Sequence, residues 1–193
     1  PIKIDFYRLL CSSLIGLALL ASTPVFAKAV PERADIDAEF KWDLTGMYTG
    51  ATAWEADRER FLEALPTLSS HRGKLGESGA NLLKAIENIQ TVETIIANLY
   101  VYAGLRSFED TRISENAARF SEAQGMYSQY QQALAYFTPE LLAIPDETLT
   151  QFIAETPGLE VYEHYLNETA RMRPYTLSEA EERLLAMASD PLD

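Results

Sequence analysis

Two histidines, His71 and His164, are the first residues to consider for metal or acid–base chemistry. His164 has Glu160 four residues before it and Glu168 four residues after it, so the three side chains would share one helix face. One imidazole and two carboxylates can hold a metal ion, but a single histidine beside acidic residues is more often part of a solvated helix surface. His71 lies in a glycine-rich loop without an acidic residue or a second histidine at ligand spacing. We therefore expect no metal ligand in this chain.

Two acidic pairs, Glu109/Asp110 and Glu181/Glu182, have the composition of a general acid–base pair. Such a pair needs two environments that separate its pKa values, and the sequence places neither pair in a cleft. Asp110 is better explained as a helix cap, and Glu181 as half of a capping box with Ser178. The chain contains neither a Gly-x-Ser-x-Gly turn nor a His-Glu-x-x-His motif. No catalytic residue is predicted.

Tyrosines on the two longest helical patterns are the remaining candidates for a functional surface. They are Tyr100, Tyr102, Tyr127, Tyr130 and Tyr136. Tyrosine rings that line a groove could contact a peptide substrate. The favoured interpretation is a seam between two helices, because the apolar part of each ring can pack while its hydroxyl group reaches water.

Apolar residues recur at three- and four-residue spacings along most of the chain, which predicts an all-α fold. The expected elements are two long antiparallel helices with shorter helices packed beside them. We predict helices over about 52–66, 81–103, 110–137, 146–155 and 158–169, and another that begins at Ser178. The expected N-terminal caps are Thr52 with Glu55, then Asn81, then Asp110 and Thr111.

Residues 1–27 have the pattern of a secretory signal peptide. Lys3 and Arg8 precede an apolar run of about 13 residues, and small residues precede Lys28. This pattern predicts cleavage between Ala27 and Lys28 and an exported protein, either periplasmic or extracellular. The run is short for a membrane span, which needs roughly 20 apolar residues. A leader that is not cleaved would instead anchor the chain to the membrane.

The composition limits the function classes further. The net charge of −13 disfavours binding to nucleic acids, because an acidic surface repels phosphate groups. Cys11 is the single cysteine and lies in the predicted leader, so the mature chain would have no disulfide and no thiol nucleophile.

We divide the chain into the signal peptide, an N-terminal arm over 28–50 and a helical domain over 51–193.

Three stretches resemble known sequences in the same order and at similar spacing. They are WDLTGMY (42–48) followed by Trp54-Glu55, LYVYAGLRSFEDT (99–111) and RMRPYTLSEAEERLLA (171–186). Together they resemble the N-terminal region of oligoendopeptidase F, a branch of the thimet-oligopeptidase-like zinc peptidases. The resemblance covers essentially everything from about 35 to 193. Tyr175 departs from it, because family members frequently have a histidine before the Thr-Leu-Ser cap.

The resemblance implies a helical domain that forms one wall of a deep substrate channel in a zinc endopeptidase acting on short peptides. In that family two histidines of His-Glu-x-x-His and a later glutamate bind zinc, and the glutamate of the motif acts as the base. None of these residues has a matching position here. We therefore expect a fragment that is inactive alone, with zinc and the oligopeptide substrate belonging to the parent enzyme. The alternative is an exported helical module that binds a peptide or a partner protein without catalysis.

The predicted leader can be tested by the mass of the exported chain. We expect intact-mass spectrometry of the secreted product to give a chain that starts at Lys28. An Ala27→Leu variant should keep the leader, because a large side chain does not fit the small-residue site before the cleaved bond. Ala29→Leu is the control and should be processed normally. A wild-type product that still contains residues 1–27 would show instead that the leader is retained as an anchor.

Overall fold

The computed structural model describes residues 31–176, and the chain divides into one unit up to Lys41 and a second unit from Trp42. In the first unit the described residues form two short 3-10 turns, η1 (Arg33–Asp35) and η2 (Ala38–Phe40). The leader and the predicted helix from Ser178 lie outside the described residues. The division into leader, arm and helical domain stays a prediction.

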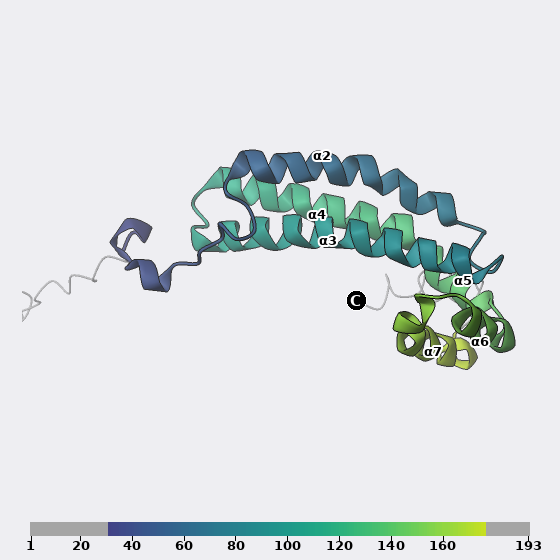
Figure 1. The fold of residues 1–193 in the computed structure, drawn as a ribbon. Coiled ribbons are helices and arrows are strands. Elements are labelled where there is room, and N and C mark those ends of the chain that lie inside the picture. Colours follow the sequence, from purple (N-terminus) through teal and green to yellow (C-terminus); the bar gives the residue numbers. More distant parts are fainter. Residues whose placement is uncertain (1–30, 177–193) are drawn as a thin grey trace, which may run out of the picture. The chain divides into compact units, whose positions relative to one another are not determined.

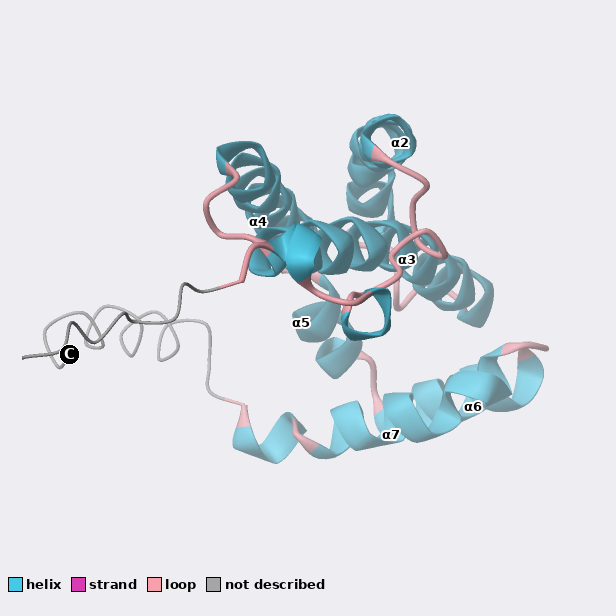
Figure 2. Ribbon diagram, turned by 90° about the vertical axis from the view of Figure 1, so that its left-hand side faces the viewer, coloured by secondary structure: helices cyan, strands magenta, loops and turns pink. Residues whose placement is uncertain are grey.

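The second unit is built on three long helices, α2 (Ala51–Leu68), α3 (Gly79–Glu109) and α4 (Ser114–Leu134). They lie side by side and alternate in direction, and α2 and α4 both pack against α3 and against each other (Figures 1 and 2). The prediction of long antiparallel helices is confirmed. Residues 31–176 contain no strand, and none of their helices is both long and apolar enough to cross a membrane.

A group of shorter helices follows α4 and gathers where α2 ends and α3 begins (Figure 1). Tethers between distant segments hold it there, including a hydrogen bond from the Tyr136 hydroxyl to the Leu68 carbonyl at 2.7 Å. These helices are α5 (Phe137–Ala143), α6 (Asp146–Glu155) and α7 (Glu163–Arg171), with the 3-10 turns η3 (Ser69–His71), η4 (Leu159–Tyr162) and η5 (Arg173–Tyr175).

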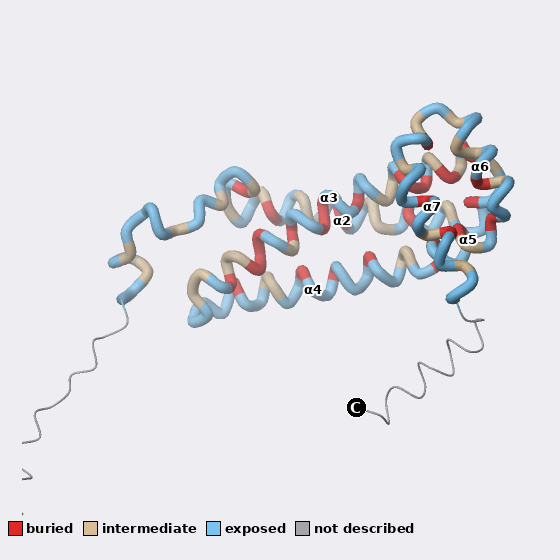
Figure 3. The backbone as a smooth tube through the Cα atoms, turned by 90° about the horizontal axis from the view of Figure 1, so that it is seen from below, coloured by how far each residue is buried: buried red, intermediate tan, exposed pale blue. Residues whose placement is uncertain are grey.

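Helix α3 contributes to two hydrophobic cores, which Figure 3 shows as buried positions along its length. Its C-terminal half packs with α2 and α4 in a core that includes Trp54, Phe61, Val92, Leu99 and Met126. Its N-terminal half packs with the short helices in a core that includes Leu82, Ile86, Leu141, Leu159 and Leu166. Ile89 packs against both cores. The predicted apolar stripe of this helix is confirmed.

The predicted cap of α2 was wrong. Helix α2 begins at Ala51, and Gly50 occupies the N-cap position without a side-chain hydrogen bond. Thr52 therefore already lies inside the helix and cannot form a capping box with Glu55. Just before the helix, Tyr48 is buried and donates a hydrogen bond from its hydroxyl group to Asp57 of α2 at 2.9 Å.

The predicted caps of α3 and α4 were also displaced. Ser78 caps α3 by accepting a hydrogen bond from the Asn81 backbone N–H at 3.2 Å, which leaves Asn81 in the first turn. Asp110 ends α3 rather than starting α4, because its carboxylate accepts hydrogen bonds from the backbone and the guanidinium group of Arg112. Helix α4 consequently begins at Ser114, four residues later than Asp110.

Two further details differ from the expected pattern. Helix α2 continues past Pro66 to Leu68, because the carbonyl that loses its partner belongs to Leu62, whose residue is 40% exposed and can be solvated. In the first turn of α4 the buried residue is polar, since the Asn116 side-chain amide donates to the Arg106 carbonyl at 3.1 Å.

The packing of α3 against α6 predicts opposite effects for two glycine-to-alanine changes. A Cβ atom on Gly79 would lie 2.0 Å from Thr156 Oγ1 and 3.2 Å from Phe152 Cβ, whereas a Cβ atom on Gly125 would meet nothing within 4 Å. We expect Gly79→Ala to lower the free energy of unfolding by about 1–3 kcal/mol through overpacking. Gly125→Ala should raise it by about 0.5–1 kcal/mol, because alanine favours a helix interior.

Urea denaturation followed by circular dichroism measures both free energies, and each variant serves as the control for the other. Stabilisation by both changes would contradict the close approach of α6 to the start of α3.

Candidate functional site

The described surface contains a groove that runs between α3 and α4 and is closed at one end by η4 and α7. Its volume is about 620 Å³. We call it the tyrosine groove, because four tyrosines line it together with Gln90, Glu93, Gln131 and an apolar floor. The tyrosines are Tyr127, Tyr130, Tyr162 and Tyr165, and the floor consists of Ile86, Ile89, Leu134 and Phe137.

The rings of the groove continue into an aromatic row along α3 and α4. Tyr127 lies 6.2 Å from Tyr130 and 5.5 Å from Tyr100, measured between ring centroids. Tyr100 in turn meets Phe120 edge-to-face at 5.3 Å. The separations are within the range of favourable aromatic pairs. The structure therefore brings together three of the five tyrosines noted in the sequence, and Tyr127 stays 42% exposed at the edge of the seam.

Two glutamines restrain the rings at the rim of the groove. The Tyr162 hydroxyl group donates to Gln90 Oε1 at 2.8 Å and links η4 to α3. Gln131 Nε2 donates to the Tyr127 hydroxyl oxygen, also at 2.8 Å. These bonds limit rotation of the two phenol groups, so the walls of the groove are preformed.

The groove is electrostatically one-sided. Burial raises the pKa of Tyr130, and the negative charge of Glu93 raises it further, so this phenol stays neutral at physiological pH. Glu93 is exposed at the rim. The lining residues include no lysine, arginine or histidine. The groove therefore offers aromatic faces and one carboxylate without a cation.

The other two tyrosines lie elsewhere and stabilise the fold. Tyr102 packs edge-to-face on Tyr48 with a centroid distance of 5.1 Å. Tyr136 donates to the Leu68 carbonyl, and the guanidinium group of Arg72 lies 5.4 Å from the centre of its ring. The expected packing of tyrosines between two helices is found for Tyr100, Tyr127 and Tyr130 but not for these two residues.

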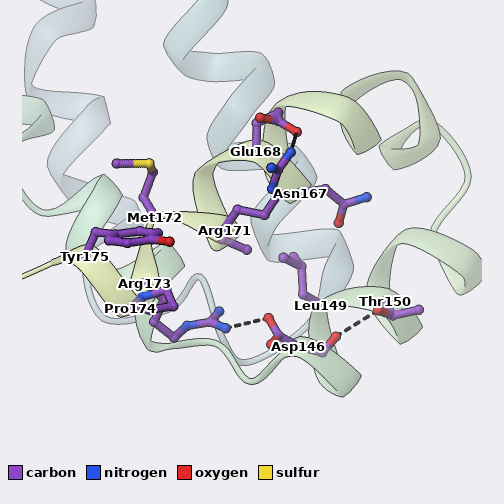
Figure 4. A pocket seen from close by; sticks show the side chains of 11 residues that line it. Asp146, Leu149, Thr150, Asn167, Glu168, Arg171, Met172, Arg173, Pro174 and Tyr175 are labelled. Carbon is purple, nitrogen blue, oxygen red and sulfur yellow. Dashed lines mark hydrogen bonds and ion pairs between the residues drawn. The ribbon is translucent and has the colours of Figure 1, made fainter.

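A second hollow, of about 690 Å³, lies where α6, α7 and η5 meet (Figure 4). Its charged side chains are already paired. Arg173 donates to the Leu142 and Ile144 carbonyls, both at 2.7 Å, and forms an ion pair with Asp146. Arg171 pairs with Glu168 at 2.6 Å. Because Arg173 donates to carbonyl groups at the end of α5, we interpret this hollow as a structural contact that holds η5 against the end of α5.

The residues considered for metal binding remain apart. Glu160 accepts a hydrogen bond from the Gly158 backbone at 2.6 Å and Glu168 pairs with Arg171, so neither carboxylate is directed to His164. Among residues 31–176 no group of three histidine, cysteine, aspartate or glutamate side chains could hold a metal ion. The described residues therefore do not fit a zinc ion.

The acidic pair Glu109/Asp110 belongs to the turn between α3 and α4. Glu109 pairs with Arg106 at 2.7 Å and Asp110 with Arg112 at the same distance. Glu181 and Glu182 lie outside the described residues, as do Ala27 and Lys28 of the predicted cleavage site. Both carboxylates of the described pair are thus engaged in ion pairs at the turn.

Known proteins are similar to this chain in both sequence and fold. A family model described as oligopeptidase F matches residues 140–193. Oligopeptidase PepF of Bacillus subtilis is 37% identical over 166 residues, which cover 86% of this chain. The chain belongs to the oligopeptidase F family. It spans about a quarter of that relative's length, since the match covers 25% of PepF.

Solved structures agree with membership of the oligopeptidase F family. A proposed peptidase from Chlamydophila abortus has a TM-score of 0.73 at 26% identity, over 84% of this chain and 28% of that one. Oligoendopeptidase F from Enterococcus faecium has a TM-score of 0.60 at 32% identity, over 72% of this chain and 27% of that one. The all-α fold described above is therefore the fold of the corresponding part of these two proteins.

Several residues that line the tyrosine groove were not predicted from the sequence, among them Gln90, Glu93, Gln131, Tyr162 and Tyr165. Gln90 and Glu93 occupy the polar edge of the α3 stripe, and Tyr162 and Tyr165 lie in a segment too short for a clear pattern. The three-residue spacing within each pair was the available signal, because it places both members on one helix face.

His71 supports a prediction about pH. Its Nε2 lies 3.2 Å from Asn88 Nδ2, and an amide nitrogen can only donate, so Nε2 must be the unprotonated acceptor. Burial lowers the pKa of His71 below 6.5, and the charges of Lys84 and Lys74 lower it further. The unfolded chain therefore binds a proton more readily, and stability should fall as the pH drops below about 6.5 towards the lower folded-state pKa.

We expect His71→Gln to lose less stability than the wild type between pH 8 and pH 5, measured by urea denaturation at both values. His164→Gln is the matched control, since that ring is exposed, and it should keep the wild-type pH dependence. Equal pH dependence for wild type and His71→Gln would show that the His71 ring is protonated without cost in the folded state.

Proposed function

We propose that this chain is the N-terminal helical portion of a zinc-dependent oligoendopeptidase that hydrolyses peptide bonds in short peptides. The observation that carries this proposal is the 37% identity to oligopeptidase PepF along 86% of the chain. The fold supports it, because two peptidase structures share it over most of this chain. Activity would belong to the longer protein, since the match covers a quarter of PepF.

The role of this portion would be to shape the substrate channel rather than to perform the chemistry. The tyrosine groove has a volume of about 620 Å³ and supplies an aromatic surface on which a peptide can lie. Because the described residues do not fit zinc, the metal would be held by residues outside them. When bound, zinc would lower the pKa of a water molecule and polarise the scissile carbonyl group.

We also propose that the protein is exported, on the basis of the leader pattern over residues 1–27. Export would bring the enzyme to peptides outside the cytoplasm. The net charge of −13 supports peptides rather than nucleic acids as ligands.

The first test is to read the source gene in frame beyond codon 193. We expect it to encode a His-Glu-x-x-His motif and a later glutamate. The purified product should cleave an internally quenched octapeptide, lose activity with a zinc chelator and regain it with zinc. Replacing the motif glutamate by glutamine should lower kcat by about 10²–10⁴-fold, the usual contribution of a general base.

The 193-residue chain alone is the control and should not cleave the same peptide. A stop codon directly after Asp193, with a stable fold and no hydrolysis, would favour the exported binding module instead. Activity that persists after complete removal of the metal would contradict zinc dependence.

A further inference from the structure

The chemistry of the tyrosine groove indicates which kind of group it binds. Four tyrosines line it, and the π face of a tyrosine ring has a negative electrostatic potential that attracts cations. Two of these residues stay accessible, with Tyr127 42% and Tyr165 49% exposed. Tyr130 is buried, and it lines the groove together with Tyr165 and Glu93. The rings and the carboxylate therefore act on the same small volume.

Some polar groups of the groove already have hydrogen-bond partners among residues 31–176, and one does not. The Gln90 carbonyl oxygen accepts from Tyr162, and the Gln131 amide nitrogen donates to Tyr127. By contrast, Glu93 forms no hydrogen bond or ion pair with the described residues, although Arg58, Arg106, Arg119 and other basic residues pair with acids elsewhere. Glu93 is therefore the lining charge that a ligand can neutralise.

Charge complementarity distinguishes a cationic ligand from an apolar one. An apolar occupant would cover Glu93 and remove part of its hydration without returning a partner, which is unfavourable. A guanidinium or ammonium group would stack on a ring and also pair with the carboxylate. The net charge of −13 adds a long-range attraction for cations.

We propose that the tyrosine groove binds the cationic side chain of an oligopeptide, an arginine or a lysine, against the tyrosine rings with Glu93 as its counter-charge. That the cation belongs to a peptide rests on the proposed function. The site would select among short peptides by their basic residues.

The test is a nuclear magnetic resonance titration of the 193-residue chain with N-acetyl-Ala-Ala-Arg-Ala-Ala-amide, whose only charge is the guanidinium group. The matched ligand replaces arginine by citrulline, which has nearly the same shape and no charge. We expect saturable shifts of the backbone signals of Gln90, Glu93 and Tyr127, and an affinity about fivefold lower for the citrulline peptide.

Three variants complete the test. Glu93→Gln should weaken binding of the arginine peptide about fivefold. Tyr165→Leu should weaken it as well, because the exposed ring is lost while the helix is kept. Glu87→Gln is the control on the same helix and should bind normally, since Glu87 does not line the groove. Circular dichroism verifies that each variant is folded.

Equal affinity for the two peptides, or no saturable shift at the groove, would overturn the proposal. The titration involves no hydrolysis, so its failure would leave the peptidase assignment standing. Conversely, an inactive parent protein would leave the binding result intact.

Discussion

The structure depends on one constraint: a single helix must complete two hydrophobic cores. Helix α3 has 31 residues and is therefore about 46 Å long. Its C-terminal half is buried by α2 and α4, and the Trp54 indole N–H donates to the Leu99 carbonyl at 3.0 Å inside that core. Its N-terminal half is buried by the short helices, where Gly79 allows α6 to approach. The helices of the second unit group into two sets accordingly, one at each half of α3.

The tyrosine groove arises where these two cores meet. Ile89 packs against both cores and also forms part of the groove floor. The polar positions beside it, Gln90 and Glu93, face outward because the apolar face of α3 is already occupied. The hydrogen bond between Tyr162 and Gln90 then joins the group of short helices to the long ones. The groove is thus a consequence of joining two packed groups along one helix, and its shape depends on tethers such as Tyr136 and Arg173.

Much of the fold could be predicted from the sequence, because long amphipathic stripes such as that of α3 need only regular spacing. The bounds of α6 were predicted as observed, at 146–155. The helix starts were not, since several side chains near them could act as caps and the sequence does not show which partner each one takes, as Asp110 with Arg112 illustrates. A sequence also reveals which face of a helix a tyrosine occupies but not what lies opposite it. For that reason Tyr100 and Tyr102 seemed to form one cluster although they lie on different sides of α3.

The order of the two cores along the chain has a consequence for synthesis on the ribosome. The core of α2, α3 and α4 uses residues 44–134, whereas the second core needs residues up to Ala170. The first core can therefore fold while the segment that forms α5, α6 and α7 is still inside the exit tunnel, because domains form from the N-terminal end during translation. During that interval Leu82, Ala85 and Ile86 lack the short helices that cover them and present an apolar strip to solvent. An exposed apolar strip of this kind favours aggregation, and the strip is buried once the short helices have emerged and completed the second core.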